Sequence, residues 1–261
     1  MIHLSGMRTN VATDGEGPCA VFVHGQGGDL RSWDRLWPYL IGSHRLVRYD
    51  LRDYGGSCST SEHEFTHSED LAELIEALTV DRCDLVGVSM GGGIALSFAL
   101  DHPERVRSLT LISPQIAAWE WSEDWQARWQ PIIDAARGGK MEQAKQLWWE
   151  HPMFATTRAS EAARDLREEI ERFTGLAWQL DRHALVMPDI ERVHKLHVPT
   201  LLLSGTEDME DFQLMSDILT GSSELVQQVY VPEAGHLAHL EKPQFCAGHI
   251  IDFWQRTSAP L

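Results

Sequence analysis

The sequence predicts an α/β fold in which a mostly parallel, doubly wound sheet carries a helical cap insertion. Apolar runs of strand length alternate with segments of helical periodicity, which is the pattern of parallel strands joined by crossover helices. Residues 114–195 interrupt this alternation, because their periodicity is helical throughout and they contain seven of the ten tryptophans. With 261 residues, 43% of them hydrophobic, the chain can bury one large core. We therefore expect one core formed by residues 1–113 and 196–261, with a helical cap at 114–195.

Six apolar runs, each bounded by polar or turn residues, have the length and composition of buried strands. They cover residues 20–24, 46–50, 84–88, 108–113, 200–205 and 226–231. The clearest helix between them begins at Thr66, because Thr66 and Glu69 have capping-box spacing and the apolar residues that follow recur on one face. In the insertion, Gly138, Gly139 and Pro152 separate successive helical segments.

Charge and cysteine content exclude several functional classes. A formal net charge of −17 argues against nucleic acids and anionic membrane surfaces as partners. No apolar run reaches membrane-spanning length and the N-terminal segment lacks the features of a secretory signal, so we expect a cytoplasmic protein. The four cysteines form no CxxC pair, which argues against a disulfide framework and a zinc site. We therefore expect a small-molecule substrate, no cofactor and no metal, in a monomer or homodimer.

The stretch DLVGVSMGGGIAL, residues 84–96, runs from a strand pattern through a serine and three glycines into a helix pattern. Gly87 and Gly91 flank Ser89 at Gly-x-Ser-x-Gly spacing, which is the pattern of a nucleophile elbow. Small neighbours permit the sharp turn, and the turn lifts the serine hydroxyl clear of the sheet. A glycine-rich turn with a capping serine, or a phosphate-binding loop, is the alternative. No G-x-G-x-x-G register fits here, which argues against a dinucleotide site.

A serine hydroxyl is a weak nucleophile unless a histidine takes its proton and a carboxylate orients that histidine. In doubly wound hydrolases the acid follows a late strand and the histidine follows the last one. Asp208 comes after the fifth expected strand, and His236 comes after the sixth. Each has an alternative, because Asp208 lies in an acidic loop of the kind that is usually solvated, and His239 lies one turn beyond His236. Order and position together favour Ser89, Asp208 and His236 as a catalytic set.

Acyl transfer also needs hydrogen-bond donors for the developing oxyanion. The first expected strand ends in HGQGG, residues 24–28, whose glycines let backbone N–H groups approach a ligand. Met90 follows the candidate nucleophile at the start of a helix, where N–H groups lack a partner within the helix. We expect the backbone N–H groups of Gln26 and Met90 to be the donors, and His24 to tie loops together. An ordinary strand-to-helix turn is the alternative for this loop.

Four segments, HGQGG, GVSMGG, GTED and AGHLAHLEKP, give the chain a resemblance to the α/β-hydrolase superfamily over nearly its whole length. Within it, the chain is most similar to small-cap enzymes such as 3-oxoadipate enol-lactonases and related esterases. The resemblance implies the roles of nucleophile for Ser89, acid for Asp208, base for His236 and oxyanion donors for Gln26 and Met90. In YDLRDYGGS the family has a glycine where this chain has Asp53, so we expect a different local turn there.

The insertion supplies the candidate substrate contacts. Trp121, Trp125 and Trp129 recur every fourth residue and therefore share one helix face. These rings either pack on the sheet core or line an aromatic pocket above the nucleophile. The candidate substrate-binding residues are Trp125, Trp129, Trp148, Trp149 and Phe154. Arg128 and Arg158 are candidates for binding a substrate carboxylate, although long charged side chains are more often solvated.

Three functions remain open. The favoured one is a serine hydrolase that cleaves a carboxylic ester or lactone of a small to medium, apolar or ring-containing substrate through an acyl-enzyme. The second is a C–C bond hydrolase of ring-cleavage products, which typically has asparagine where this chain has Val88. The third is a hydrolase-like ligand sensor. A complete catalytic set favours an enzyme over a sensor.

Overall fold

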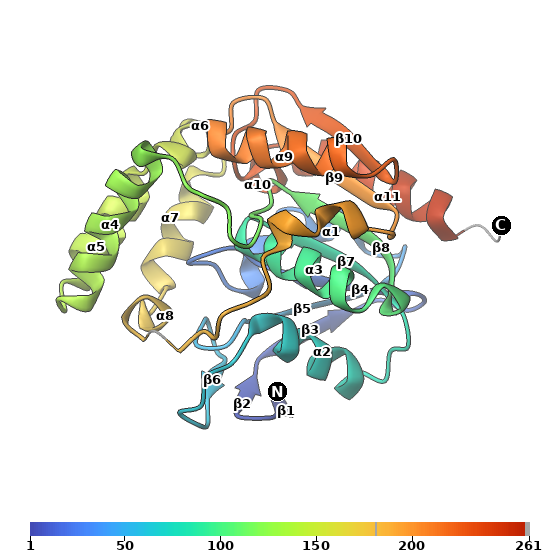
Figure 1. Cartoon of the computed structure of the whole chain (residues 1–261), viewed down its shortest axis with the longest axis horizontal. Coiled ribbons are helices and arrows are strands. Elements are labelled where there is room, and N and C mark those ends of the chain that lie inside the picture. Colours follow the sequence, from blue (N-terminus) through green and yellow to red (C-terminus); the bar gives the residue numbers. More distant parts are fainter. Residues whose placement is uncertain (181, 259–261) are drawn as a thin grey trace.

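A seven-stranded sheet lies at the centre of the computed structural model, which describes residues 1–180 and 182–258 (Figure 1). Its strand order is β10, β9, β8, β7, β4, β5, β3, and each neighbouring pair is parallel except β3 with β5. The strands are β3 (Val11–Asp14), β4 (Cys19–Val23), β5 (Arg45–Tyr49), β7 (Cys83–Val88), β8 (Val106–Ile112), β9 (Thr200–Gly205) and β10 (Val226–Val231). Those other than β3 overlap the predicted runs, which confirms the predicted, mostly parallel sheet.

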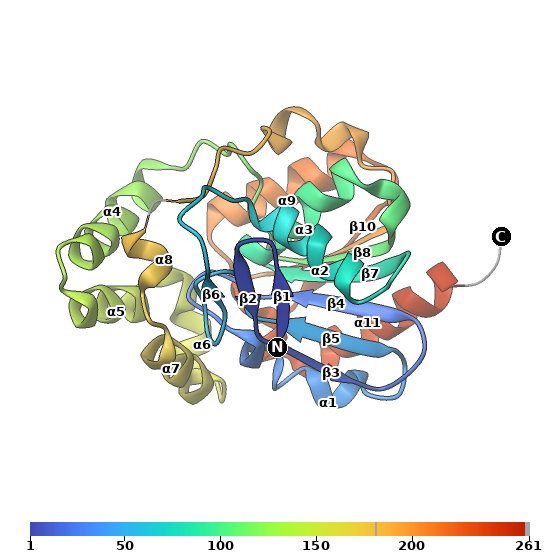
Figure 2. The same ribbon diagram turned by 90° about the horizontal axis from the view of Figure 1, so that it is seen from below.

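Helices cover both faces of this sheet (Figure 1 and Figure 2). One face carries α2 (His67–Ala77), α3 (Met90–Asp101) and α9 (Glu210–Ser222), and the other carries α1 (Trp37–Leu40) and α11 (Pro243–Ser258). The hydroxyl of Thr66 accepts the Glu69 N–H at 3.1 Å and so caps α2, as the sequence spacing predicted. Most of α3 is buried, because it lies between the sheet and α2. The candidate nucleophile, Ser89, therefore lies between two well-packed elements, β7 and α3.

A second sheet of three short strands lies outside the sequence prediction. It pairs β1 (Ile2–Leu4), β2 (Met7–Thr9) and β6 (Cys58–Ser59) in antiparallel fashion, and it lies at the bottom of Figure 1, where β1 packs against α2. The guanidinium of Arg52 donates to the carbonyls of Ser5 and Gly6 and to the carboxylate of Asp70 in α2. This buried ion pair connects the small sheet to the main core. Strands of two or three residues are too short to show a period-two pattern in the sequence.

The chain between β8 and β9 is largely helical and lies to the left of the sheet in Figure 1. It contains α4 (Glu123–Arg137), α5 (Met141–Glu150), α6 (Ala155–Ala159), α7 (Ala163–Arg172) and α8 (Leu176–Gln179), which we call the inserted helices. Their indole rings pack on one another. Trp121 stacks on Trp125 with ring centroids 4.2 Å apart, and Trp129 meets Trp178 edge-on at 5.9 Å. Phe212 of α9 joins this cluster at 5.5 Å from Trp125, so the cluster also packs against the core.

The four cysteines are free thiols, and Cys19, Cys83 and Cys246 are buried. Burial raises the pKa of Cys246 to about 12, so this thiol stays protonated and packs as a small apolar side chain. In the described part of the chain, no helix combines the length and the apolar character needed to cross a membrane.

Candidate active site

Ser89 forms the turn between β7 and α3. Its backbone angles are φ 55° and ψ −121°, a conformation that residues with a side chain rarely adopt. A Cβ on Gly87 would lie 2.3 Å from the Gly91 carbonyl oxygen, and a Cβ on Gly91 would lie 2.1 Å from the Val23 carbonyl oxygen. Both distances are far inside van der Waals contact, so both positions require glycine. The Gly-x-Ser-x-Gly spacing therefore follows from the close approach of α3 to β4 and β7.

Backbone hydrogen bonds hold Ser89 from both sides. Its N–H donates to the Ile112 carbonyl of β8 at 2.9 Å, and its carbonyl accepts the N–H groups of Gly93 and Gln115, each at 3.0 Å. Gln115 stands just after β8, at the start of the insertion. The strained turn is therefore bonded to its own helix, to the neighbouring strand and to the first residues of the inserted segment.

His236 lies in the loop after β10, and its ring faces Asp208 in the loop after β9. The Nδ1 atom of His236 is 3.1 Å from Asp208 Oδ1 and 3.2 Å from Oδ2, and both side chains are almost completely buried. Phe212 packs against the imidazole, with ring centroids 4.1 Å apart. A carboxylate at Nδ1 favours the tautomer with its proton on that nitrogen. The buried Nε2, which has no hydrogen-bond partner among the described residues, is then able to accept a proton.

Neither Glu207, the acid next to Asp208, nor His239, the alternative base, belongs to this pair. Glu207 is exposed, unlike the neighbouring Asp208. His239 packs against the indole of Trp33, with ring centroids 5.0 Å apart. Burial and, to a smaller degree, the neighbouring His236 together lower the pKa of His239 to about 3. His239 is therefore a neutral, buried ring at ordinary pH.

Glu241 of α10 (Ala238–Glu241) is a site residue that sequence reasoning missed. Its carboxylate accepts the Gly235 N–H at 2.9 Å and the hydroxyls of Thr156 and Thr157 at 3.1 and 2.6 Å. A Cβ on Gly235 would lie 2.0 Å from Thr156 Oγ1, so this position also requires glycine. One carboxylate thus ties the loop of His236 to α6 of the inserted helices.

Asp211 makes a second link of this kind. It lies in the first turn of α9 and is buried, although acidic loops of this kind are usually solvated. Its carboxylate accepts the Trp119 indole N–H at 2.9 Å and both the N–H and the hydroxyl of Ser122, at 3.2 and 2.6 Å. Ser122 in turn accepts the Trp125 N–H and caps α4. The start of α4 is therefore fixed to the start of α9.

The loop after β4 lies directly against the elbow, since a Cβ on Gly25 would be 3.4 Å from Ser89 Cβ. His24 connects this loop to the one after β5, because its Nε2 accepts the Leu51 N–H at 3.0 Å and its Nδ1 lies 2.9 Å from the Gly25 carbonyl. Burial lowers the pKa of His24, which keeps the ring neutral. The loop-connecting role predicted for His24 agrees with these contacts. Gln26 accepts the Tyr54 hydroxyl through its side chain at 2.9 Å.

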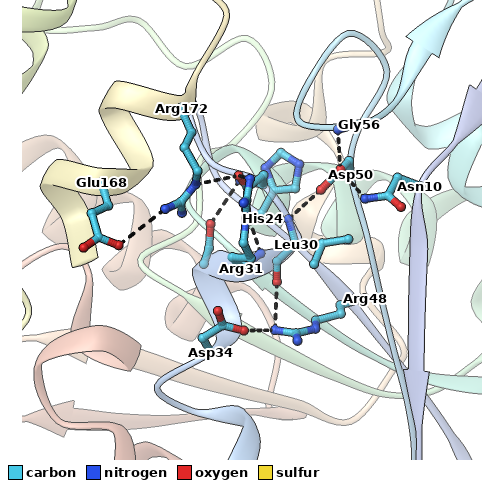
Figure 3. A network of polar contacts seen from close by, with 12 residues as sticks. Asn10, His24, Leu30, Arg31, Asp34, Arg48, Asp50, Gly56, Glu168 and Arg172 are labelled. Carbon is cyan, nitrogen blue, oxygen red and sulfur yellow. Dashed lines mark hydrogen bonds and ion pairs between the residues drawn. The ribbon is translucent and has the colours of Figure 1, made fainter. Parts of the chain in front are cut away.

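A network of charged groups holds the far end of this loop (Figure 3). Asp29 accepts the Arg31 guanidinium at 2.6 Å, and Arg172 of α7 lies 3.4 Å from the same carboxylate. Glu168, one turn back on α7, pairs with Arg172 at 3.7 Å. Burial by itself would raise the pKa of Asp29, but the bonds from Arg31 and the charge of Arg172 bring it below its usual value. The loop is thus tied to the inserted helices as well as to the core.

Three cavities adjoin the elbow. The tryptophan cavity, of about 280 Å³, is lined by Ser89, Gln26, Gln115, Trp121, Trp125, Gln126, Trp129, Trp148 and Met153. The large cavity, of about 520 Å³, shares Gln26, Gln115 and Trp121 with it. Its other lining residues include Arg52, Asp53, Tyr54, His67 and Met90. The small cavity, of about 20 Å³, is lined by Ser89, His236, His239, Glu169, Ser32, Gly25 and Gln26 together with apolar side chains.

Most of the predicted substrate contacts lie beside Ser89. Trp125, Trp129 and Trp148 line the tryptophan cavity, and Phe154 lines the small cavity. Trp149 does not line these cavities, and the guanidinium of Arg167 lies over its ring at 5.2 Å from the centroid. Neighbouring residues on a helix point about 100° apart, and here Trp148 faces the cavity while Trp149 faces Arg167.

The two arginines proposed to bind a substrate carboxylate have other partners. Arg128 pairs with Asp124 on the exposed side of α4, at 2.7 Å. Arg158 donates to the carbonyls of Trp149 and His151 at 2.6 and 2.8 Å, and so satisfies the end of α5. The structure therefore corrects this expectation, because both guanidinium groups are used within the inserted helices.

Known proteins resemble the chain over almost its whole length. The family model of the alpha/beta hydrolase fold matches residues 21–243. A pyrrolizixenacetamide deacetylase of Xenorhabdus hominickii is 26% identical over 93% of each chain, and 3-oxoadipate enol-lactonase 1 of Acinetobacter baylyi is 25% identical over 87% of this chain and 85% of its own. The crystal structure of a hydrolase from Pseudomonas aeruginosa has a TM-score of 0.82 at 25% identity and covers 97% of both chains. The chain therefore belongs to the alpha/beta hydrolase fold family.

Proposed function

We propose that the protein is a serine hydrolase that cleaves a carboxylic ester or lactone through an acyl-enzyme. The observation that carries the proposal is the His236–Asp208 pair, whose histidine lines the same small cavity as Ser89. Ser89 is the nucleophile, His236 is the general base and Asp208 orients the imidazole. The hydrolases of several kinds among its relatives support this class of reaction but differ in substrate.

In the first half-reaction, Ser89 Oγ attacks the acyl carbon while His236 Nε2 takes the hydroxyl proton. The N–H groups of Gln26 and Met90 donate to the carbonyl oxygen as it becomes negative. Met90 opens α3, so its N–H has no acceptor within the helix and is available for this task. The tetrahedral intermediate then collapses, and His236 returns the proton to the leaving oxygen as its bond to carbon breaks.

The substrate class follows from the groups that line the large cavity. Arg52 is bonded to Asp70, and Asp53 accepts the Ser59 hydroxyl and pairs with Arg182. Burial keeps the pKa of His67 well below its usual value, so this ring is neutral. Beside these described residues, a substrate carboxylate would lose its hydration without gaining an unpaired cation. We therefore infer an uncharged substrate whose apolar or aromatic part occupies the cavities under the inserted helices, which act as a cap over the site.

A matched pair of activated esters tests both parts of this proposal. The p-nitrophenyl ester of butyric acid and the p-nitrophenyl monoester of succinic acid have acyl groups of similar size that differ by a carboxylate. We expect kcat/KM to favour the butyrate by about tenfold or more, which corresponds to about 1.4 kcal/mol of unfavourable carboxylate burial. The protein should also be labelled by a fluorophosphonate probe.

Three contrary results would each change a different part of the proposal. Equal or faster turnover of the succinate ester would overturn the inferred charge preference. Negligible turnover of esters and lactones beside fast cleavage of a vinylogous diketone would replace the proposal with a C–C bond hydrolase. A folded protein that is neither labelled nor active would instead be a ligand sensor.

A further inference from the structure

The small cavity contains a carboxyl group to which the proposed first half-reaction gives no role. Its volume of about 20 Å³ has room for one water molecule. Glu169 of α7 lines it together with Ser89, His236 and Ser32. The neutral ring of His239, the loop residues Gly25 and Gln26, and apolar side chains complete the wall. The apolar residues are Val88, Trp148, Met153, Phe154, Leu166, Leu237 and Leu240. A water in this space would lie within reach of the nucleophile and of the base.

Glu169 of α7 is half-buried at the small cavity, and Asp165, one turn earlier, is half-buried beside Arg35. Glu168 and Glu171 lie on the exposed side of the same helix. The Glu169 carboxyl and the Ser32 hydroxyl both lie close to Gly28. A Cβ added to Gly28 would be 3.1 Å from Glu169 Oε1 and 2.6 Å from Ser32 Oγ. The carboxyl and the hydroxyl therefore meet at the edge of the loop that carries Gln26.

The surroundings of Glu169 favour its uncharged form. Burial raises the pKa of Glu169 to about 8. The other groups that act on it are Ser32, Arg172 and Arg31, which lower the pKa, and Asp29, which raises it. A protonated carboxyl has both a donor and an acceptor for a water molecule, and it adds no negative charge beside a developing oxyanion. His236 Nε2, which has no partner among the described residues, lies in the wall of the same cavity.

We propose that Glu169 binds and orients the water molecule that hydrolyses the acyl-enzyme. The inference rests on the proposed function and assigns a residue to its second half-reaction. The water oxygen forms a bond to the acyl carbon, and one of its protons passes to His236 Nε2. Its other hydrogen is held by the carboxyl oxygen of Glu169. The intermediate then breaks the bond between the acyl carbon and Ser89 Oγ, and the proton moves from His236 to that oxygen, which releases the acid and the free enzyme.

Three variants separate this role from a structural one. Glu169→Leu removes both polar partners of the water and keeps a side chain of similar size. Glu169→Gln keeps a donor and an acceptor at the same place. Glu171→Gln removes a carboxylate from the exposed side of the same helix, where it pairs with Arg167. The measurement is stopped-flow release of p-nitrophenol from p-nitrophenyl butyrate, in which the burst reports acylation and the steady state reports deacylation.

We expect Glu169→Leu to keep the burst rate within about threefold and to lower the steady-state rate by about 10²-fold, the loss typical of a reacting molecule held out of position. Glu169→Gln should retain most of the steady-state rate, and Glu171→Gln should match the parent protein. The burst amplitude counts the folded, active fraction of each variant. Mass spectrometry should show that butyryl-Ser89 persists much longer in Glu169→Leu than in the parent protein and the other two variants.

Two results would overturn the role of Glu169. One is an unchanged steady-state rate in Glu169→Leu, and the other is an equal loss of burst and steady-state rates, which would indicate a structural effect. Failure of the proposed function is distinguishable from both, because the parent protein would then form no acyl-enzyme on Ser89 at all, and the role of Glu169 would fall with it.

Discussion

Replacing Glu241 by glutamine should loosen the loop of His236 without removing a group that touches substrate. The Glu241 carboxylate accepts the Gly235 N–H at 2.9 Å and the hydroxyls of Thr156 and Thr157 at 3.1 and 2.6 Å. A glutamine side chain has one accepting oxygen, and its NH₂ group would face a donor on the other side. At least one of the three donors therefore loses its partner, and the remaining bonds lose their charge.

The magnitude follows from these bonds. A hydrogen bond to a charged group contributes about 1.5–3 kcal/mol, and a buried donor left unpaired costs about 1–3 kcal/mol. We therefore expect Glu241→Gln to lower the free energy of unfolding by about 2–4 kcal/mol. At about 2 °C per kcal/mol for a chain of this size, the Tm should fall by about 4–8 °C. The kcat for a neutral ester should fall by about tenfold, because His236 is held less firmly against Asp208.

Differential scanning calorimetry and steady-state kinetics check this prediction, and the same loop provides the control. Glu233 is exposed and pairs with Lys242 at 3.2 Å, so Glu233→Gln should lower stability by less than about 1 kcal/mol. A Tm loss in Glu241→Gln no larger than that of the control would refute the argument from buried donors. A clear Tm loss with unchanged kcat would refute the link to the catalytic histidine.

Four further predictions concern the site. Ser89→Ala should abolish fluorophosphonate labelling and lower kcat by about 10³-fold or more; persistent turnover by the folded variant would remove Ser89 from the mechanism. Asp208→Asn should lower kcat by about 10⁴-fold, because an amide favours the wrong histidine tautomer, whereas the exposed Glu207→Gln should have little effect; exchanged effects would mean that the acid is misassigned. Gln26→Ala should be mild and Gln26→Pro severe, because only proline removes the backbone donor; equal effects in folded variants would place the donor elsewhere. The pKa of Glu169 is raised from 4.5 to about 8, so between these pH values the folded state binds more protons than the unfolded state and stability falls as pH rises. Urea midpoints should show a shallower fall in Glu169→Gln, and an unchanged slope would contradict the raised pKa.

The parallel sheet and the elbow could be predicted because their signals are local in sequence. A strand run, two glycines and a serine within a few residues encode the turn at Ser89, whose strain and close contacts leave few alternatives. Asp208 and His236 could be placed in the same way, because strands that share a sheet bring their following loops to one edge. Residue type alone does not distinguish His236 from His239. Only their positions relative to the last strand separated them, because His236 lies in the loop after that strand and His239 lies one helical turn further on.

The hydrogen bonds that connect the inserted helices to the core left no comparable local signal in the sequence. Glu241 meets hydroxyls that are 84 and 85 residues away in sequence, and Asp211 meets groups 89 and 92 residues away. Glu169 is one of several acids in a highly charged helix, and only the docking of α7 distinguishes it from Glu168. Contacts of this range depend on how the inserted helices settle on the core, which periodicity and motif spacing do not report.

Grafting a different helical segment onto this core would have to spare the residues that follow β8. Gln115 donates its N–H to the Ser89 carbonyl, and Pro114 lies so close to α3 that a Cβ on Gly92 would be 2.8 Å from it. A chimaera joined at Ser113 would take both contacts from the donor segment, and the nucleophile would keep the bond that supports its positive φ only if that segment brings a backbone N–H to the same place. A crossover placed after Gln115 leaves the elbow intact, so new specificities are best recombined into this scaffold from that residue onward.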